Sequence, residues 1–438
     1  MLVNSRFSIV IENGNHLCRA SENEASSISQ TSRENFLRKT YLTLSAIVLF
    51  AAVGSNSAIA QSEISLMEFL DNVSLLFSQV NESKKQQDYQ TAEKSFTELI
   101  VSFSRLSEEN QKQLDWLQSE FYYGRACCLS LQNKIEAAVN DFEKAVNVHG
   151  FTAYSRANAD TDLDNIRNNE RFVALMESIR EYDYANVLRQ SGKYQSADAT
   201  GLPRFTYEAA TSNNLNYVRH FFNLDEIAGD GDEISKIINL MKWVYDNIRH
   251  DGSTYTICEY TSIDIYNYHK STDKGVNCRL LAIVLNEIYL AMGFKSRFVT
   301  CGPKDNSDVH VINSVFSTTL NKWLWMDPSF NAYWKDENGN LLSIAEVRER
   351  LIDDRPLLLN EDASWSDGRP LTRATYLDGW MAKNLYWFER TVHSGFNSES
   401  PYRNTNQTYI RLVPLCSELE PATSHLIMTH DAIYFWEH

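Results

Sequence analysis

GVNCRLLAIVLNEIYLAMG, residues 275–293, is one of the least polar stretches of the chain. Apolar side chains occur on nearly every face of a helix built over residues 278–292, which predicts a central helix buried on all sides. Gly293 fits the end of that helix. A cysteine stands at the opposite end, at position 278. The fold expected around this helix therefore carries a thiol at the start of its most buried element.

Cys278 occupies the first turn of the predicted helix, where unpaired backbone N–H groups point outward. The positive end of the helix dipole at this place lowers a thiol pKa and favours the thiolate. Gly275 allows a tight approach of the chain and leaves room for a substrate near the sulfur. A buried structural cysteine is the alternative, and this helix alone does not decide between the two.

The segment SDVHVINSVFSTTLNKWLWMDPSFNAYW, from residue 307, predicts two strands. Residues 309–316 alternate with a period of two, and Lys322 to Met326 form the second strand, ended by Pro328. If residues 317–320 form a four-residue loop, Phe316 faces Asn321. Counting back from that pair, His310 faces Asp327. Opposed residues share a face of the sheet, so a carboxylate is expected beside an imidazole.

A histidine opposed to an aspartate, near a cysteine at a helix N-terminus, is the arrangement of nucleophile, base and orienting acid. GVNCRLLAIVLNEIYLAMGFKSRFV, then HVINSV, then KWLWMDPSF, resembles the transglutaminase-like superfamily, which has a papain-like fold. The likeness covers about residues 255 to 335. It implies an α+β domain with an antiparallel sheet, placed at residues 200–438.

The resemblance assigns Cys278 as nucleophile, His310 as base and Asp327 as orienter. It implies acyl transfer through a thioester, from a Gln carboxamide, a peptide or an isopeptide amide, to water or an amine, with no cofactor and no metal. Many relatives carry an aromatic residue two positions after the histidine, where this chain has Ile312. The side chain that helps to hold the oxyanion in relatives is not identified, and the backbone N–H of Cys278 is the one firm candidate.

The rest of this domain is less informative. An amphipathic helix is expected over 233–252, and a loop or short strands over 255–269. EVRERLIDDR, from residue 346, is expected to be a solvated helix, whereas the C-terminal TYIRLVPL and AIYFWE are expected to add strands to the sheet. Four aromatic residues are expected mostly in the core: Trp323, Trp325, Tyr333 and Trp334.

Residues 61–190 contain almost no Gly or Pro and show helical spacing, which predicts an all-α domain. Within FYYGRACCLSLQNKIEAAVNDFEKAVNVHG, from residue 121, small residues and Phe142 fit two closely packed helices. This segment resembles a tetratricopeptide repeat. A weaker copy lies 46 residues earlier, at Ala92 and Phe96, and the longer spacing requires an insertion within 102–113. The functional alternatives are a binding surface for a protein partner or the substrate, and a spacer.

The first 60 residues predict an N-terminal extension with a signal peptide. Arg38 and Lys39 precede an apolar run over 41–53, and Ala58-Ile59-Ala60 resembles a cleavage site. The mature chain is expected to begin at Gln61 and to be exported, periplasmic or secreted, without a stable membrane span. An uncleaved anchor is the alternative.

Composition narrows the function further. The 438 residues contain 57 acidic and 41 basic side chains, a net charge of -16 that argues against nucleic acid as a partner. The seven cysteines show no zinc-site spacing. Two functions remain: an exported cysteine hydrolase, favoured over a cross-linking transferase because water is abundant, and a catalytically silent module that binds a cell-surface peptide or glycan.

Overall fold

The chain forms two compact units, one up to Asp183 and one from Tyr184 onward. The first unit is all-helical, and the second combines helices with a six-stranded mixed sheet. The boundary falls before the helix over 184–190, which packs within the second unit. The computed structural model describes residues 63–194, 201–252, 256, 258–306, 308–399, 407–421 and 424–437. The predicted signal peptide lies outside them.

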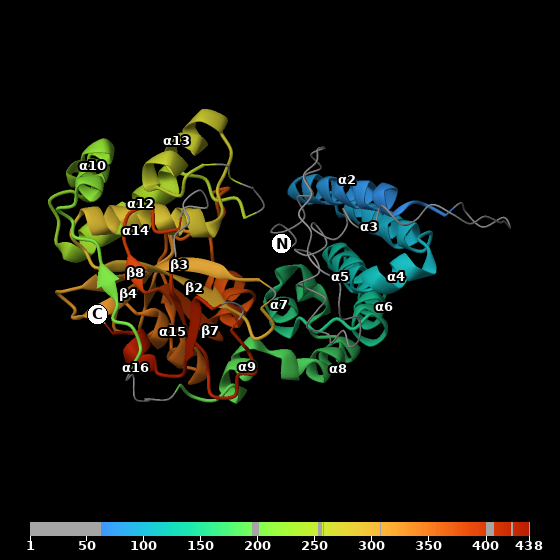
Figure 1. Ribbon diagram of the computed structural model, residues 1–438. Helices are drawn as coiled ribbons and strands as arrows, with labels where there is room; N and C mark the ends of the chain where they lie inside the picture. Colours follow the sequence, from blue (N-terminus) through green and yellow to red (C-terminus); the bar gives the residue numbers. More distant parts are fainter. Residues whose placement is uncertain are drawn as a thin grey trace. The chain divides into compact units, whose positions relative to one another are not determined.

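Antiparallel helix pairs build the first unit (Figure 1). Helix α2 packs on α3, α3 on α5, and α5 on α6. A Cβ atom on Gly124 of α5 would lie 2.2 Å from the ring of Phe96 on α3, so only glycine allows this close approach. The helices are α2 (Leu66–Lys85), α3 (Tyr89–Phe103), α4 (Glu108–Leu114), α5 (Trp116–Leu131), α6 (Ile135–Glu143), α7 (Tyr154–Ala159) and α8 (Glu170–Ser178).

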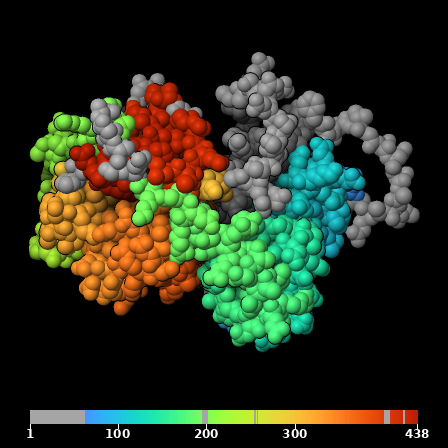
Figure 2. All heavy atoms as spheres, turned by 90° about the horizontal axis from the view of Figure 1, so that it is seen from below, coloured from blue at the N-terminus to red at the C-terminus, as the bar shows by residue number. Residues whose placement is uncertain are grey.

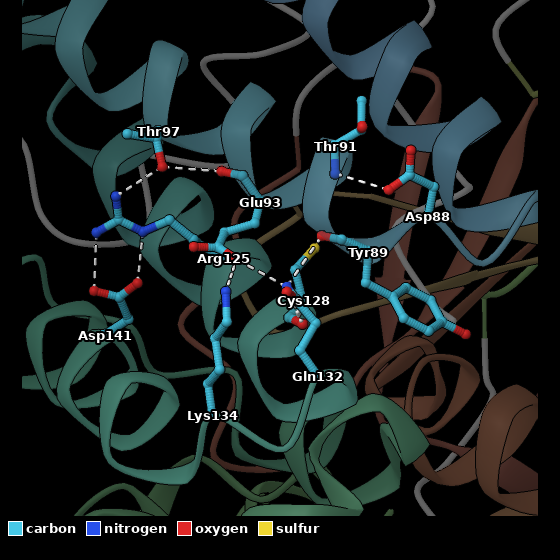
Figure 3. A network of polar contacts seen from close by, with 10 residues as sticks. All are labelled: Asp88, Tyr89, Thr91, Glu93, Thr97, Arg125, Cys128, Gln132, Lys134 and Asp141. Atoms are coloured by element: carbon cyan, nitrogen blue, oxygen red, sulfur yellow. Dashed lines mark hydrogen bonds and ion pairs between the residues drawn. The ribbon is translucent and has the colours of Figure 1, made fainter.

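Polar side chains also connect these helices, as Figure 3 shows. Arg125 of α5 forms a two-pronged ion pair with Asp141 of α6, with N···O distances of 2.6 and 2.9 Å. Gln132 and Lys134, in the turn between α5 and α6, each donate to Glu93 of α3 at 2.8 Å. Helix α4 lies where the long spacing predicted an insertion. The tetratricopeptide assignment stays a prediction.

The sheet of the second unit has the strand order β10-β9-β7-β2-β3-β4. All neighbouring strands are antiparallel except β9 and β10, which are parallel. The strands are β2 (Ser296–Gly302), β3 (His310–Ser317), β4 (Lys322–Met326), β7 (Trp387–Thr391), β9 (Tyr409–Leu412) and β10 (Leu426–Thr429). Two short pairs lie apart from it: β1 (Thr206–Tyr207) with β8 (His393–Ser394), and β5 (Trp334–Lys335) with β6 (Leu358–Leu359).

Helices cover both faces of this sheet, so β3 is buried along its whole length. Val311 and Val315 face the core around α14, whereas Ile312 faces a second core that includes α15. Figure 1 shows α14 against the strands, with α10, α12 and α13 on the same side of the sheet and α15 on the other side. The helices are α9 (Tyr184–Gln190), α10 (Asn213–Phe222), α11 (Leu224–Ala228), α12 (Glu233–Asn247), α13 (Ser262–Thr272), α14 (Cys278–Ala291), α15 (Ile344–Ile352) and α16 (Ala432–Phe435).

The ends of the second unit lie side by side. The hydroxyl of Tyr434 donates to the backbone oxygen of Pro203 at 2.6 Å. In Figure 2 the red C-terminal residues of this unit adjoin green residues from its beginning. Within the part of the chain that the structure describes, no helix is long and apolar enough to cross a membrane.

The β3–β4 register differs from the predicted one by two residues. Phe316 pairs with Trp323, and Ser317 with Lys322, so the loop runs over 318–321 instead of 317–320. Glu233 of α12 holds this loop, because its carboxylate accepts hydrogen bonds from Ser317 Oγ at 2.6 Å and from the backbone N–H groups of residues 318 and 319. His310 is therefore not directly opposite Asp327.

Other expectations for the second unit were partly wrong. Helix α12 ends at Asn247, five residues before Gly252, and 262–272 form a helix where a loop or strands were expected. AIYFWE begins helix α16 instead of a strand. Helix α15 is not simply a solvated face, because Arg348 is 4 % exposed and donates to Leu385 O and Ser191 Oγ. The four core aromatic residues are confirmed as buried.

Candidate active site

Helix α14 begins at Cys278, as its sequence predicts. The side chain of Asn277 caps the helix by accepting a hydrogen bond from the backbone N–H of Leu280 at 3.1 Å. Cys278 is thus the first helical residue, and the N–H groups of this first turn have no acceptor within the helix. Twelve of the fourteen residues of α14 are buried, whereas Cys278 keeps some exposed surface. The buried helix therefore fixes the position of the Cys278 side chain at its N-terminus.

His310 and Asp327 form a buried hydrogen-bonded pair. Nε2 of His310 lies 2.8 Å from Oδ2 of Asp327. The exposed fractions of the two residues are 1 % and 0 %. Because the carboxylate occupies Nε2, the ring nitrogen left for the sulfur of Cys278 is Nδ1. The pair predicted from the hairpin is therefore present, although its residues are offset in register.

The carboxylate of Asp327 is held from three sides. Its Oδ1 accepts a hydrogen bond from the backbone N–H of Ser329 at 2.9 Å. Its Oδ2 accepts from His310 and also from the hydroxyl of Tyr376. The backbone of Asp327 exchanges two hydrogen bonds with Ala332, at 2.9 and 3.0 Å, which closes the turn after β4. The acid therefore has a fixed orientation and no contact with solvent.

Two imidazoles stabilise the thiolate of Cys278. Burial raises the thiol pKa, but the positive charge of His310 and hydrogen bonds from His250 and His310 outweigh this effect. The result is a pKa of about 5 for Cys278. A thiol with this pKa is almost fully ionised at neutral pH. The sulfur is thus a candidate nucleophile in its reactive form.

The same contacts raise the pKa of His310. Burial lowers the pKa of its imidazole, but the negative charges of Asp327 and the thiolate, with hydrogen bonds to both, raise the pKa to about 10. At neutral pH the stable pair is therefore a thiolate beside an imidazolium. The imidazolium then holds the proton that a leaving amine needs.

Sequence reasoning did not assign any role to His250. Its backbone forms an isolated parallel bridge with Val276, supported by the bond from Asp251 N–H to Val276 O at 2.8 Å. This bridge brings His250 beside Cys278. Gly275 makes it possible, because a Cβ atom there would lie 2.5 Å from Cβ of Asp251. The space at Gly275 was expected to admit a substrate, and the 249–251 segment fills it instead.

Aromatic rings surround the imidazole of His310. The ring of Trp380 lies edge-on at 4.9 Å and that of Phe330 lies at 5.7 Å, between ring centroids. Phe330 also contacts the ring of His250 at 5.4 Å. Ile312 lies on the same face of β3 as His310 and packs into the core that includes α15. Relatives with an aromatic residue at this position have an aromatic ring near the histidine, and here residues after Asp327 provide such rings.

One cluster of potential metal ligands lies in the helical unit, among the residues that the structure describes. Cys127, Asp160 and Asp162 are buried with their ligand atoms within 4.8 Å of one another. The ammonium group of Lys84 lies 2.6 Å from Asp162 Oδ2, and the hydroxyl of Tyr123 donates to Asp160 at 2.6 Å. A lysine thus supplies a positive charge beside this cluster.

One comparison with known proteins covers the region of the site. Residues 223–328 match the family model described as the Transglutaminase-like superfamily. That range includes Cys278, His310 and Asp327, and ends before Phe330, Tyr376 and Trp380. No curated protein and no solved structure gives a significant match. The chain therefore contains a transglutaminase-like core domain at residues 223–328, preceded by a helical region.

Proposed function

We propose that the second unit is a cysteine-dependent acyl-transfer enzyme, in which Cys278 is the nucleophile, His310 the proton carrier and Asp327 the orienting acid. The observation that supports this proposal most strongly is the buried His310–Asp327 pair, 2.8 Å apart, beside a cysteine at the first position of helix α14. Its effect is a thiol pKa of about 5 for Cys278. Lowering a thiol pKa by four units against burial requires specific partners, and such shifts concentrate at functional sites.

In the proposed mechanism the thiolate of Cys278 attacks the carbonyl carbon of an amide. The negative oxygen that develops accepts hydrogen bonds from the backbone N–H of Cys278 and from the imidazole of His250. His310 gives its Nδ1 proton to the departing amine as the C–N bond breaks, which leaves a thioester. His310 then takes a proton from water, and the resulting hydroxide releases the acid and restores the thiolate.

The substrate class proposed is a peptide, isopeptide or glutamine amide, with hydrolysis as the main outcome. Hydrolysis needs only water as the acceptor, whereas transfer to an amine needs a second binding site. Incubating the full chain with a peptide library and identifying products by mass spectrometry tests this. We expect new carboxylates with the native chain and none with Cys278→Ser. Products that carry a library amine would instead establish a transferase.

The alternative is a silent binding module built on the same core. The enzyme and the silent module would both bind a peptide, but only the enzyme would form a thioester. Brief incubation with substrate followed by acid quenching traps such an intermediate as a mass increase on Cys278. An intact protein that binds peptides, yet shows no mass increase and no product, would favour the silent module.

For the helical unit we propose a role in binding a protein partner or the substrate chain, and for the whole protein we propose export. The packed helix pairs support the first proposal, and the order of charge, apolar run and small residues over 36–61 supports the second. Expression in a secreting host tests export, because the intact mass of the product should correspond to a chain that begins at Gln61.

A further inference from the structure

The orienting acid of the site has a second side-chain partner that lies outside the matched core domain. The hydroxyl of Tyr376 donates to Oδ2 of Asp327, the same oxygen that binds His310. Tyr376 lies in the turn η4 (Ala374–Asp378), 49 residues after Asp327 in the chain. Its position is fixed by the bond from its backbone N–H to Thr372 O at 2.9 Å.

The ring of Tyr376 is fully buried, which leaves its hydroxyl few choices of partner. It stacks on the indole of Trp334, with ring planes 5° apart and centroids 6.0 Å apart. Phe330 and Trp380, which contact His310, also contact this ring at 5.4 and 6.0 Å. Because the aromatic side chains hold the ring on several sides, the hydroxyl is directed at the carboxylate.

The hydroxyl of Tyr376 stays protonated throughout the range in which the site titrates. Burial and the charge of Asp327 raise its pKa well above the usual value of tyrosine. The thiol of Cys301 on β2 also lies nearby and is neutral, because burial and the charge of Asp327 raise its pKa as well. Tyr376 is therefore a permanent donor that presents the positive end of its O–H dipole to Asp327.

We propose that Tyr376 is a positioning residue, whose hydroxyl acts through Asp327 to set the charge that His310 presents to Cys278. This inference rests on the proposed function, because it assumes that the thiolate–imidazolium pair is the working state. The O–H dipole withdraws part of the negative charge of the carboxylate from His310. The imidazolium then stabilises the thiolate more strongly, because less of its positive charge is compensated.

The sign of the expected effect follows from this dipole. Removing the hydroxyl makes the electrostatic potential at the site more negative, and a more negative potential raises the pKa of every group in it. Tyr376→Phe removes the hydroxyl and keeps the stacked ring. We expect the pKa of Cys278 to rise by about half a unit, since only part of one charge-assisted hydrogen bond reaches the sulfur.

The measurement is the pH dependence of alkylation of Cys278 by iodoacetamide in the full chain, resolved by peptide mass spectrometry. The matched control is Tyr289→Phe. Tyr289 is equally buried, and its hydroxyl donates one bond, to Ile237 O at 2.8 Å, from the far part of helix α14. This control should lose stability like Tyr376→Phe and leave the alkylation midpoint unchanged. A purely structural Tyr376 would show the same result as the control, and this would overturn the inference.

A second variant tests the inference even if Tyr376→Phe does not fold. Site-specific 3-fluorotyrosine at position 376 keeps the ring and hydroxyl but makes the hydroxyl more acidic and hence a stronger donor. The midpoint should then move downward, opposite to Tyr376→Phe. A midpoint unmoved by fluorination contradicts the inference even if Tyr376→Phe does not fold. If the native protein shows no lowered midpoint for Cys278, the proposed function itself fails, which is a distinct result.

Discussion

His310 and Asp327 are not cross-strand partners, yet Nε2 and Oδ2 of the two side chains lie 2.8 Å apart. Continuing the β3–β4 register would place residue 329 opposite His310, so Asp327 is its diagonal neighbour. Diagonal positions share a face and are within reach of long side chains. The bond from Ser329 N–H and the bond from Tyr376 then turn the carboxylate toward the ring.

Replacing Asp327 by Asn should separate orientation from charge. Without the negative charge the imidazolium of His310 is less stable, so its pKa should fall from about 10 by at least roughly one unit. Turnover should fall on the order of 100-fold or more, because the ring loses the partner that orients it. The alkaline limb of the activity profile measures the first effect. Asp353→Asn, which removes the same charge at an exposed position, should leave the limb in place.

The pH profile of the native enzyme should be a broad plateau. Below about pH 5 the thiolate gains a proton and the nucleophile is lost, and above about pH 10 the imidazolium loses the proton that the leaving group requires. Measuring kcat/KM across this range locates both limbs. A narrow optimum centred between ordinary histidine and cysteine pKa values would mean that the two groups titrate independently.

Gly275→Ala should damage the site through the backbone. The new Cβ would lie 2.5 Å from Cβ of Asp251 and 3.0 Å from Arg249 O, so the 249–251 segment must move and His250 with it. We expect a loss of about 1–3 kcal/mol in unfolding free energy. The thiol pKa of Cys278 should also rise, because one of its hydrogen bonds weakens.

The control for this change is Gly252→Ala. Gly252 lies in the same segment of the chain, and a Cβ atom there would have no described residue within 4 Å. Thermal unfolding and the alkylation midpoint should both stay near their native values. If Gly275→Ala behaves like Gly252→Ala in both measurements, then the 249–251 segment is not fixed against Gly275.

Glu233→Gln should loosen the β3–β4 hairpin. Bonds from Ser317, Thr318 and Thr319 lower the pKa of this carboxyl to about 2, although partial burial opposes the shift. A lowered folded-state pKa stabilises the fold above the unfolded value, near 4.5, and this stabilisation is lost as the pH falls through about 2. We expect a loss of about 1–2 kcal/mol at neutral pH and a smaller difference from the native chain in acid. The free energy of unfolding is measured in urea at neutral and at acidic pH. Glu349→Gln, on the exposed side of α15, is the control.

Local sequence signals predicted a large part of this architecture. The apolar content of residues 278–292 and Gly293 predicted helix α14 nearly to the residue, and β4 agrees with its predicted bounds. The predicted position of the β3–β4 loop was wrong, and counting along the hairpin could not include the contact of Ser317 with Glu233, which lies 84 residues earlier. The prediction of a strand for AIYFWE was wrong because four to six apolar residues do not distinguish a strand from a helix turn.

The site was predictable where its residues lie on neighbouring elements. Cys278, His310 and Asp327 follow from a helix start and one hairpin. His250 was missed because a backbone bridge to Val276 brings it to the sulfur, and that bridge leaves no periodic signal. Tyr376 was missed because it arrives through packing against Trp334 from a turn far along the chain. Such contacts depend on tertiary structure.

The central claim is that His310 makes Cys278 a thiolate, and alkylation tests it directly. In His310→Ala the thiol pKa should return from about 5 toward its ordinary value of 9.0. Near pH 6 the thiolate fraction then falls almost a thousandfold, but a more basic thiolate is also more nucleophilic, so the rate falls only about tenfold. The midpoint of the pH profile is therefore the better readout.

The decisive experiment compares Cys278 with the exposed Cys416 in the same protein, by site-resolved labelling with iodoacetamide from acid to alkaline pH. The account predicts a midpoint near pH 5 for Cys278 in the native chain, a rise of at least about two units in His310→Ala, and no change for Cys416. A native midpoint at Cys278 that equals that of Cys416, or one that does not move in His310→Ala, would contradict it.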